Sequence, residues 1–102
     1  MAEQWVKAGK ISDIPEGLGH RVKLDGLDIA LFRLGRSVYA LEDFCPHLGF
    51  PLSEGIVRDD EVICAWHGWH VRLADGGCLS ERNKAKTYPV EVRGDEVWVL
   101  AL

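Results

Sequence analysis

The chain has 102 residues, 47% of them hydrophobic, so residues 1–102 are expected to form a single domain with a small core. The formal net charge is −4 and the basic residues are scattered, which excludes nucleic acid as an expected partner. The apolar runs are far too short to cross a bilayer, the N-terminus lacks the features of a signal peptide, and three cysteines are too few for a secreted disulfide scaffold, so a cytoplasmic location without membrane contact is expected.

Apolar and polar residues alternate with a period of two over most of the chain, and this pattern predicts an all-β domain. Along the chain, helical structure is expected only as one turn, from Ile11 to Ile14. The dipeptide Asp25-Gly26 then separates two alternating segments, 20–24 and 27–34. Because both residues of this dipeptide tolerate positive φ, the pattern predicts a tight type I′ hairpin.

Beyond the hairpin, the sequence predicts further strands separated by two loops. Residues 42–55 contain several prolines and glycines and are predicted to be the first loop. The second loop is expected at 66–69, directly after a strand that delivers Cys64 at its end. A closing hairpin is expected to turn at Arg93-Gly94-Asp95. The strands of this second part are expected at 38–41, 61–65, 71–73, 87–92 and 96–100.

The two predicted loops each carry one thiol and one imidazole, in Cys45-Pro46-His47 and in Cys64-Ala65-Trp66-His67. One cysteine and one histidine per loop is the ligand arrangement that holds a [2Fe–2S] cluster asymmetrically, with two thiolates on one iron and two imidazoles on the other. Neutral imidazoles lower the negative charge of the site, which makes the added electron easier to accept. The sequence therefore predicts a cluster held by Cys45, His47, Cys64 and His67.

A structural zinc ion held by the same four residues is the alternative. Zinc sites usually group like ligands, as Cys-x₂₋₄-Cys and His-x₃₋₅-His, and the mixed spacing of these loops is unusual for them.

Glycines at positions 49, 55 and 68 are expected to bring backbone N–H groups close to the bridging sulfides of the cluster, where hydrogen bonds tune the reduction potential.

The segments Cys45-Pro46-His47-Leu48-Gly49 and Cys64-Ala65-Trp66-His67-Gly68-Trp69 resemble the two cluster-binding boxes of Rieske [2Fe–2S] proteins. The similarity extends over essentially the whole chain, down to Thr87-Tyr88-Pro89-Val90. It implies a three-layered antiparallel β-sandwich with one cluster per chain at the tip of two loops. Cys45 and Cys64 would bind one iron, and His47 and His67 the other.

Two departures from the respiratory and photosynthetic members of that family bear on function. Their extra cysteines, which form a disulfide between the loops, correspond here to Phe50 and Trp66, so packing must hold the loops. The hydroxyl residue after their His-Gly is Trp69 here, so one hydrogen bond to the cluster is missing. Both changes predict a potential near the low end of the Rieske range, about −150 mV. The segment 79–88 also lacks the proline that many Rieske ferredoxins have there.

The resemblance implies a soluble one-electron carrier, monomeric when free, and not an enzyme by itself. It would pass electrons from a flavin- or NAD(P)H-dependent reductase to a terminal oxidoreductase such as a ring-hydroxylating oxygenase. The alternative is the small subunit of a cytosolic NAD(P)H-dependent nitrite reductase, which the segments 29–33 and 77–79 resemble more closely. A zinc-stabilised interaction module is the third possibility.

Other residues receive simpler interpretations. His70 is expected on the strand that leaves the second loop, facing solvent rather than binding metal, and His20 on a strand surface. Cys78 is expected to be a small buried residue. Phe50, Trp66 and Trp69 are expected to pack around the cluster, and Trp5 and Trp98 to lie in the core. The acidic residues near the loops are expected to form a solvated face, with docking of a basic partner as the alternative; they are Glu42, Asp43, Glu54, Asp59, Asp60 and Glu61.

Overall fold

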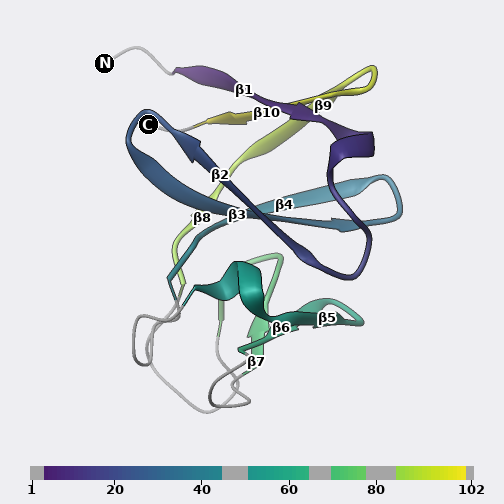
Figure 1. Cartoon of the computed structure of the whole chain (residues 1–102), viewed down its shortest axis with the longest axis vertical. Helices are drawn as coiled ribbons and strands as arrows, with labels where there is room; N and C mark the ends of the chain where they lie inside the picture. The colour runs from purple at the N-terminus through teal and green to yellow at the C-terminus, as the bar shows by residue number, and fades with distance from the viewer. Residues whose placement is uncertain (1–3, 45–50, 65–69, 78–84, 101–102) are drawn as a thin grey trace.

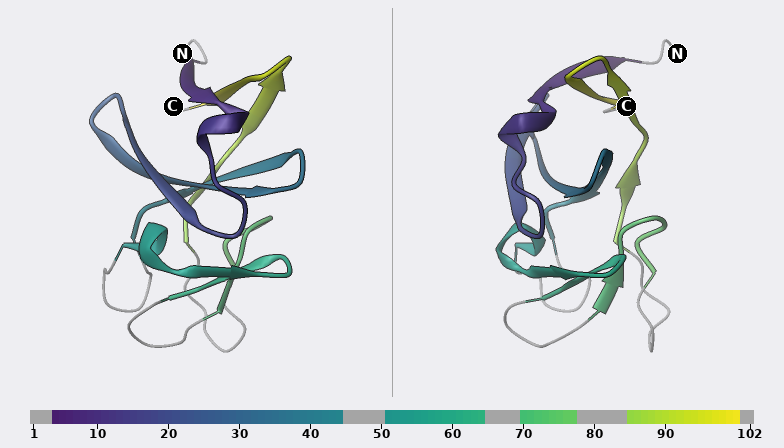
Figure 2. Two further views of the ribbon diagram at one scale, coloured as in Figure 1. Left: turned by 45° about the vertical axis from the view of Figure 1, so that its right-hand side comes forward. Right: turned by 90° about the vertical axis from the view of Figure 1, so that its right-hand side faces the viewer.

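The computed structural model describes residues 4–44, 51–64, 70–77 and 85–100, which form three antiparallel sheets (Figure 1). Sheet A has the order β1-β10-β9, sheet B the order β2-β3-β4-β8, and sheet C the order β5-β6-β7. Sheet B lies between the other two, and the rotated views keep this order (Figure 2). A helix long and apolar enough to cross a bilayer does not occur in the described residues.

The strands and the two short 3₁₀ turns have the following bounds. Sheet A contains β1 (Trp5–Lys10), β9 (Val90–Arg93) and β10 (Glu96–Leu100). Sheet B contains β2 (Gly19–Leu24), β3 (Leu27–Leu34), β4 (Ser37–Glu42) and β8 (Thr87–Tyr88). Sheet C contains β5 (Ile56–Arg58), β6 (Glu61–Ile63) and β7 (His70–Arg72). The turns are η1 (Ile11–Asp13) and η2 (Leu52–Glu54).

The β2–β3 hairpin confirms the prediction made from Asp25-Gly26. The two residues have φ angles of 49° and 79°, and Leu24 pairs with Leu27 across the turn. The helical turn at η1 and the strand at β4 also lie where they were expected. The sequence pattern does not predict β1, which is interrupted by a register shift between Lys7 and Gly9, or the three-residue strand β5.

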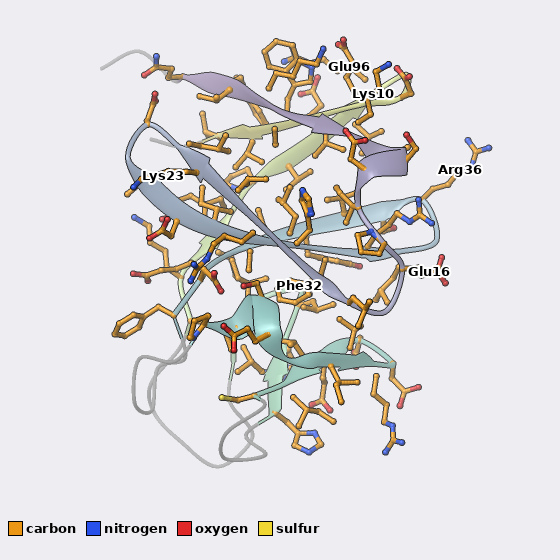
Figure 3. All side chains as sticks on the ribbon, viewed as in Figure 1. Lys10, Glu16, Lys23, Phe32, Arg36 and Glu96 are labelled. Carbon is orange, nitrogen blue, oxygen red and sulfur yellow. The ribbon has the colours of Figure 1, made fainter. Side chains whose placement is uncertain are left out.

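Strand β3 is the centre of the molecule because both of its faces are buried. Ile29 and Leu31 point into the core between sheets A and B, whereas Ala30 and Phe32 point into the core between sheets B and C. All four residues are fully buried, and Figure 3 shows Phe32 between β3 and η2. Successive side chains of a strand face opposite sides, so the stretch 29–32, which is covered on both faces, is uniformly apolar. This arrangement confirms the three-layered β-fold.

Each core has its own set of residues. The core between sheets A and B, called the upper core below, contains Ile14, Leu24, Ile29, Leu31, Val38, Ala40, Tyr88, Val97 and Val99. The core between sheets B and C, called the lower core below, contains Ala30, Phe32, Leu41, Leu52, Val62, Cys64, Val71, Leu73 and Ala85.

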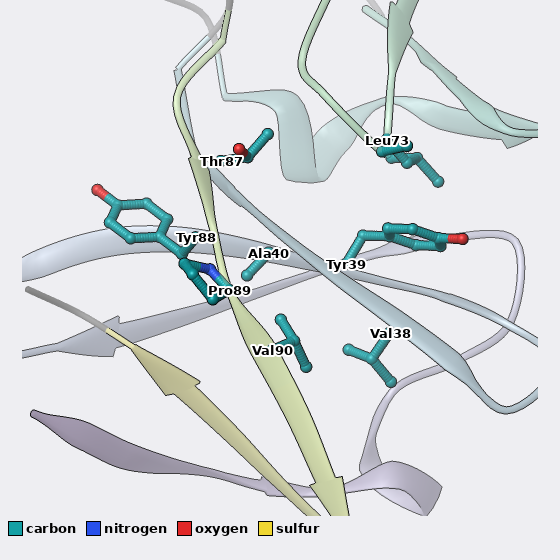
Figure 4. Close-up of a pocket in the computed structure, with 9 residues that line it drawn as sticks. Val38, Tyr39, Ala40, Leu73, Thr87, Tyr88, Pro89 and Val90 are labelled. Atoms are coloured by element: carbon teal, nitrogen blue, oxygen red, sulfur yellow. The ribbon is translucent and has the colours of Figure 1, made fainter. Parts of the chain in front are cut away.

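The predicted single strand 87–92 is wrong, because the chain changes sheets at Pro89. Thr87 and Tyr88 pair with β4 in sheet B, whereas β9 starts at Val90 and pairs with β10 in sheet A. Proline has no N–H to donate to a sheet, so it interrupts the strand. A pocket of about 450 Å³ opens where the chain leaves sheet B, and Figure 4 shows Pro89 on its wall.

The placement of Trp5 and Trp98 in the core is also wrong. Both side chains are half-buried, and the Arg93 guanidinium lies 5.8 Å from the Trp5 ring centroid and 4.6 Å from that of Trp98. Trp98 is flanked in β10 by the buried Val97 and Val99, so its ring lies on the outer face of sheet A. A cation can stack on such a ring at the surface.

Candidate metal centre

The strand that leads to the second predicted loop ends directly before Cys64. Strand β6 ends at Ile63, which pairs with His70 at the start of β7. The segment 65–69 therefore connects two neighbouring antiparallel strands. The prediction that a strand delivers Cys64 to this loop is confirmed, with the strand two residues shorter than expected.

The Cys64 thiol is suited to bind a soft metal. It is only 1% exposed and belongs to the lower core, together with Leu52, Val62 and Val71. It is a free cysteine, without a disulfide to another described residue. Thiolates prefer iron–sulfur clusters, zinc or Cu(I) to hard cations. A buried free thiol at a strand end therefore fits the sulfur ligand of a cluster.

The other three predicted ligands, Cys45, His47 and His67, lie outside the described residues, as do Phe50, Trp66, Trp69 and Cys78. The full ligand set thus stays a prediction. Elsewhere, within residues 4–44, 51–64, 70–77 and 85–100, no group of three or more histidine, cysteine, aspartate or glutamate side chains lies close enough to hold a metal ion.

The two sides of the first ligand segment are joined by a buried carboxylate. Asp43 Oδ1 accepts a hydrogen bond from the Ser53 N–H at 2.7 Å, and Oδ2 accepts one from Ser53 Oγ at 2.8 Å. Arg21 Nε donates a third bond to Oδ2 at 2.6 Å. The Asp43 side chain is fully buried. Its interpretation as part of a solvated acidic face is therefore wrong; the carboxylate ties the chain before residues 45–50 to the chain after them.

The charge of Asp43 is balanced by Arg21, whose side chain is half-exposed. The hydrogen bond from the Arg21 guanidinium to Asp43, and then the attraction of the two charges, raise the pKa of Arg21 above its usual value. A buried carboxylate without such partners would be strongly unfavourable. The polar contacts at this position are therefore needed for Asp43 to be buried at all.

Gly55 has a different role from the one predicted. Its N–H donates to the Leu52 carbonyl at 2.9 Å and so closes η2 instead of approaching a sulfide. A Cβ at this position would lie 2.5 Å from the Ile63 carbonyl oxygen. The glycine thus permits close contact between η2 and β6. Gly49 and Gly68 lie outside the described residues.

His70 occupies the predicted strand but is not simply a solvent-facing side chain. Its Nδ1 lies 2.9 Å from Glu61 Oε1, and the histidine side chain is 42% exposed. Glu61 is therefore engaged by the neighbouring strand and is not a free carboxylate of the expected acidic face.

Backbone hydrogen bonds join residues 76 and 85, on either side of the segment 78–84. The Ala85 N–H donates to the Gly76 carbonyl at 2.9 Å, and the Gly76 N–H donates to the Arg72 carbonyl at 2.8 Å. Gly76 has a φ of 73°, and a Cβ there would overlap the Ala85 carbonyl. Only glycine accommodates both this conformation and this close approach.

A residue next to each of the three segments 45–50, 65–69 and 78–84 packs in the lower core. Leu52 follows the first segment, Cys64 precedes the second and Ala85 follows the third, and all three are buried in the same cluster of side chains. Sheet C and η2 lie at the end of the molecule farthest from β1 and β10 (Figure 1). The described residues thus form a common base from which the segments 45–50, 65–69 and 78–84 start and end.

Comparison with known families and proteins is consistent with this architecture. Residues 4–95 match the family model of the Rieske [2Fe-2S] domain. The chain is 30% identical over 101 residues to the ferredoxin component of a naphthalene 1,2-dioxygenase system from Pseudomonas aeruginosa, and the alignment covers 97% of each protein. It is also 36% identical over 91 residues to a 4beta-methylsterol monooxygenase from Methylococcus capsulatus, but there it spans only 25% of the relative's length.

Two solved structures are similar over nearly their whole length. A small subunit of an NADH-dependent nitrite reductase from Mycobacterium tuberculosis has a TM-score of 0.91 and 31% identity, with 100% of this chain and 98% of that chain covered. A chain in a complex of reduced oxygenase and oxidized ferredoxin of carbazole 1,9a-dioxygenase has a TM-score of 0.85 and 32% identity, with 97% and 94% covered.

Proposed function

The chain belongs to the family of Rieske [2Fe–2S] domains, and from this premise we propose that it passes single electrons from a flavin- or NAD(P)H-dependent reductase to a terminal oxidoreductase such as a ring-hydroxylating oxygenase. The observation that carries the proposal is the match, over 97% of both proteins, to the ferredoxin component of a dioxygenase system. Such a component transfers electrons and leaves substrate chemistry to another protein. The similarity to a chain from an oxygenase–ferredoxin complex supports the same kind of partner.

We assign the cluster to Cys45 and Cys64 on one iron and His47 and His67 on the other. When bound, a [2Fe–2S] cluster with these ligands accepts and releases one electron at a higher potential than one with four cysteines. The position of Cys64 supports the assignment, since its thiol is free and is shielded from water by the lower core. The family match also favours the iron–sulfur cluster over the zinc-stabilised module.

The small subunit of a nitrite reductase remains a second candidate. The observation that favours it is the likeness to the subunit from Mycobacterium tuberculosis, with a TM-score of 0.91 over all of this chain. The two candidates share the cluster and differ in the partner: a carrier binds and leaves two proteins in turn, whereas a subunit stays bound to one. For both candidates we propose that residues 1–102 act as one domain in the cytoplasm.

The first experiment determines the cofactor. Protein purified without oxygen should contain about two iron and two acid-labile sulfide per chain, and the dithionite-reduced protein should give the rhombic EPR signal of a [2Fe–2S] cluster with mixed ligands. Colourless protein that contains zinc and no sulfide would contradict the proposal.

The second experiment separates the two candidates. A carrier should be reduced in free solution by a flavoprotein reductase and should then reduce an oxygenase in multiple turnovers. A fixed subunit should co-purify with a large partner and exchange electrons only within that complex. The ratio of free to partner-bound protein in gentle extracts, measured by gel filtration, distinguishes these outcomes.

A further inference from the structure

We propose that Asp43 is a positioning residue for the cluster: its bridge to Ser53 holds both ends of the first ligand segment and thereby sets how long the cluster is retained and at what potential it is reduced. The proposal rests on the function proposed above. The Asp43–Ser53 bridge denotes the two hydrogen bonds from the Ser53 N–H and Oγ to the Asp43 carboxylate.

The bridge spans the segment that carries two of the proposed ligands. Asp43 stands two positions before Cys45, and Ser53 stands ten positions after Asp43. Of the three hydrogen bonds that the carboxylate accepts, one comes from the Ser53 backbone N–H, one from the Ser53 hydroxyl and one from Arg21. Hydrogen bonds to a charged acceptor are shorter and roughly twice as strong as neutral ones. Two of the three hydrogen bonds that satisfy this buried carboxylate therefore join the two ends of the ligand segment.

Both ends of the bridge are fixed to the same rigid hairpin. On one side, Arg21 of β2 bonds the Asp43 carboxylate, and the Asp43 N–H donates to the carbonyl of Asp28 in β3 at 3.0 Å. On the other side, Gly19 of β2 lies so close to the Ser53 backbone that a Cβ would overlap it. The β2–β3 hairpin thus determines the separation of the two ends, and the bridge locks them at that separation.

The bridge also connects the first ligand segment to the second. Leu52, adjacent to Ser53, is fully buried and packs in the lower core that contains Cys64. A shift of η2 would therefore disturb the environment of the Cys64 thiol as well as the end of the first segment. In chains that have an additional disulfide between the loops, such a shift would be limited by a covalent bond; here the positions are Phe50 and Trp66.

The test compares cluster-loaded wild type with Asp43→Asn and Ser53→Ala. Loss of a hydrogen bond to a buried charged group should speed loss of the visible absorbance in the presence of an iron chelator by about tenfold to a hundredfold. Both variants should change the g values or line widths of the reduced cluster. Asp43→Asn should also raise the potential, because it removes a negative charge and leaves Arg21 positive.

Asp28→Asn is the matched control. It also replaces an aspartate near Arg21 by asparagine, since the charge of Asp28 acts on Arg21. The Asp28 side chain is, however, exposed and takes no part in the Asp43–Ser53 bridge. Its cluster half-life should stay within about twofold of the wild type, since exposed charges are screened by water and salt. Ser53→Thr retains a hydroxyl and should recover part of the half-life lost in Ser53→Ala.

The outcomes separate this proposal from the function on which it rests. Wild-type protein that holds no cluster would contradict the proposed function. A stable wild-type cluster, together with Asp43→Asn and Ser53→Ala variants of unchanged half-life, g values and potential, would overturn the role of Asp43 alone. Far-UV circular dichroism reports whether the β-fold persists, and Ser53→Ala decides the question if Asp43→Asn does not fold.

Discussion

The two ends of the molecule are stabilised in different ways. At sheet A, the polar contacts are exposed: Lys7 pairs with Glu96 at 2.8 Å, and Arg93 pairs with Glu91 at 2.7 Å beside the two tryptophan rings. Sheet C also carries an exposed pair, Arg72–Asp75 at 3.1 Å. Near sheet C and η2, however, there are in addition the buried Asp43 carboxylate, the buried Cys64 thiol and close backbone approaches at Gly55 and Gly76. Exposed ion pairs contribute little to stability, whereas buried polar groups must be satisfied. We therefore expect substitutions in sheet A, remote from the proposed cluster, to be tolerated better than substitutions near sheet C and η2.

The largest expected effect is the loss of the cluster in Cys64→Ser. Serine offers a hard oxygen ligand in place of a soft thiolate, and its hydroxyl enters an apolar core. We expect the variant to be colourless after aerobic purification, measured as iron and sulfide per chain. Cys78→Ser removes a cysteine outside the proposed ligand set and should retain the cluster. Normal iron content in Cys64→Ser would contradict the ligand assignment.

Two matched leucines compare the cores on the two sides of sheet B. Leu31 lies in the upper core and Leu41 in the lower core, and both are fully buried. Replacement of either by alanine should lower the free energy of unfolding by about 2–5 kcal/mol, measured by denaturant titration. Only Leu41→Ala should also shorten the cluster half-life, because Leu41 shares its core with Cys64. Equal cluster half-lives in the two variants would contradict the expectation that only the lower core affects retention of the cluster.

Two glycines with similar φ angles compare how the backbone near the proposed site and the backbone of sheet A respond to an added Cβ. Gly76 near the proposed site and Gly94 in the β9–β10 turn have φ angles of 73° and 65°. A Cβ at Gly94 would meet no atom within 4 Å, whereas one at Gly76 would overlap the Ala85 carbonyl. Gly94→Ala should therefore lower the free energy of unfolding by about 1–2 kcal/mol from backbone strain alone. Gly76→Ala should lower the free energy of unfolding distinctly more, because it adds the steric overlap to the backbone strain. A similar thermal unfolding midpoint for the two variants would show that the chain around Gly76 can shift to accept the Cβ.

The smallest expected effect is a pH dependence at sheet A. A hydrogen bond from Lys7, then one from Trp98 and the Lys7 charge, hold the pKa of Glu96 below its usual value. The pair therefore contributes stability above the pKa of about 4.5 that an unfolded glutamate has, and this contribution is lost as the pH falls through the lower folded value. Glu96→Gln should slightly flatten the acid side of the stability profile at low salt. The difference from wild type should vanish at high salt, since both side chains are exposed.

The local features of the fold follow directly from the sequence. Asp25-Gly26 predicts the β2–β3 hairpin because turn geometry depends on two adjacent residues. The strand leading to Cys64 and the turn at η1 are likewise local. The ligand pattern in Cys45-Pro46-His47 and Cys64-Ala65-Trp66-His67 indicates the cluster because its chemistry depends on residue type and spacing.

The sequence by itself thus determined the all-β class, the hairpin and the candidate ligands, because periodicity, turn chemistry and ligand spacing act between residues close in the chain. Only the tertiary structure decided that Asp43 is buried, that Trp98 is not, and that the chain changes sheets at Pro89. The physical reason is that each of these depends on residues distant in sequence. Asp43 is satisfied by Arg21 and Ser53. The residues before Pro89 pair with the distant strand β4, and the face of sheet A opposite Trp98 packs against sheet B through Val97 and Val99.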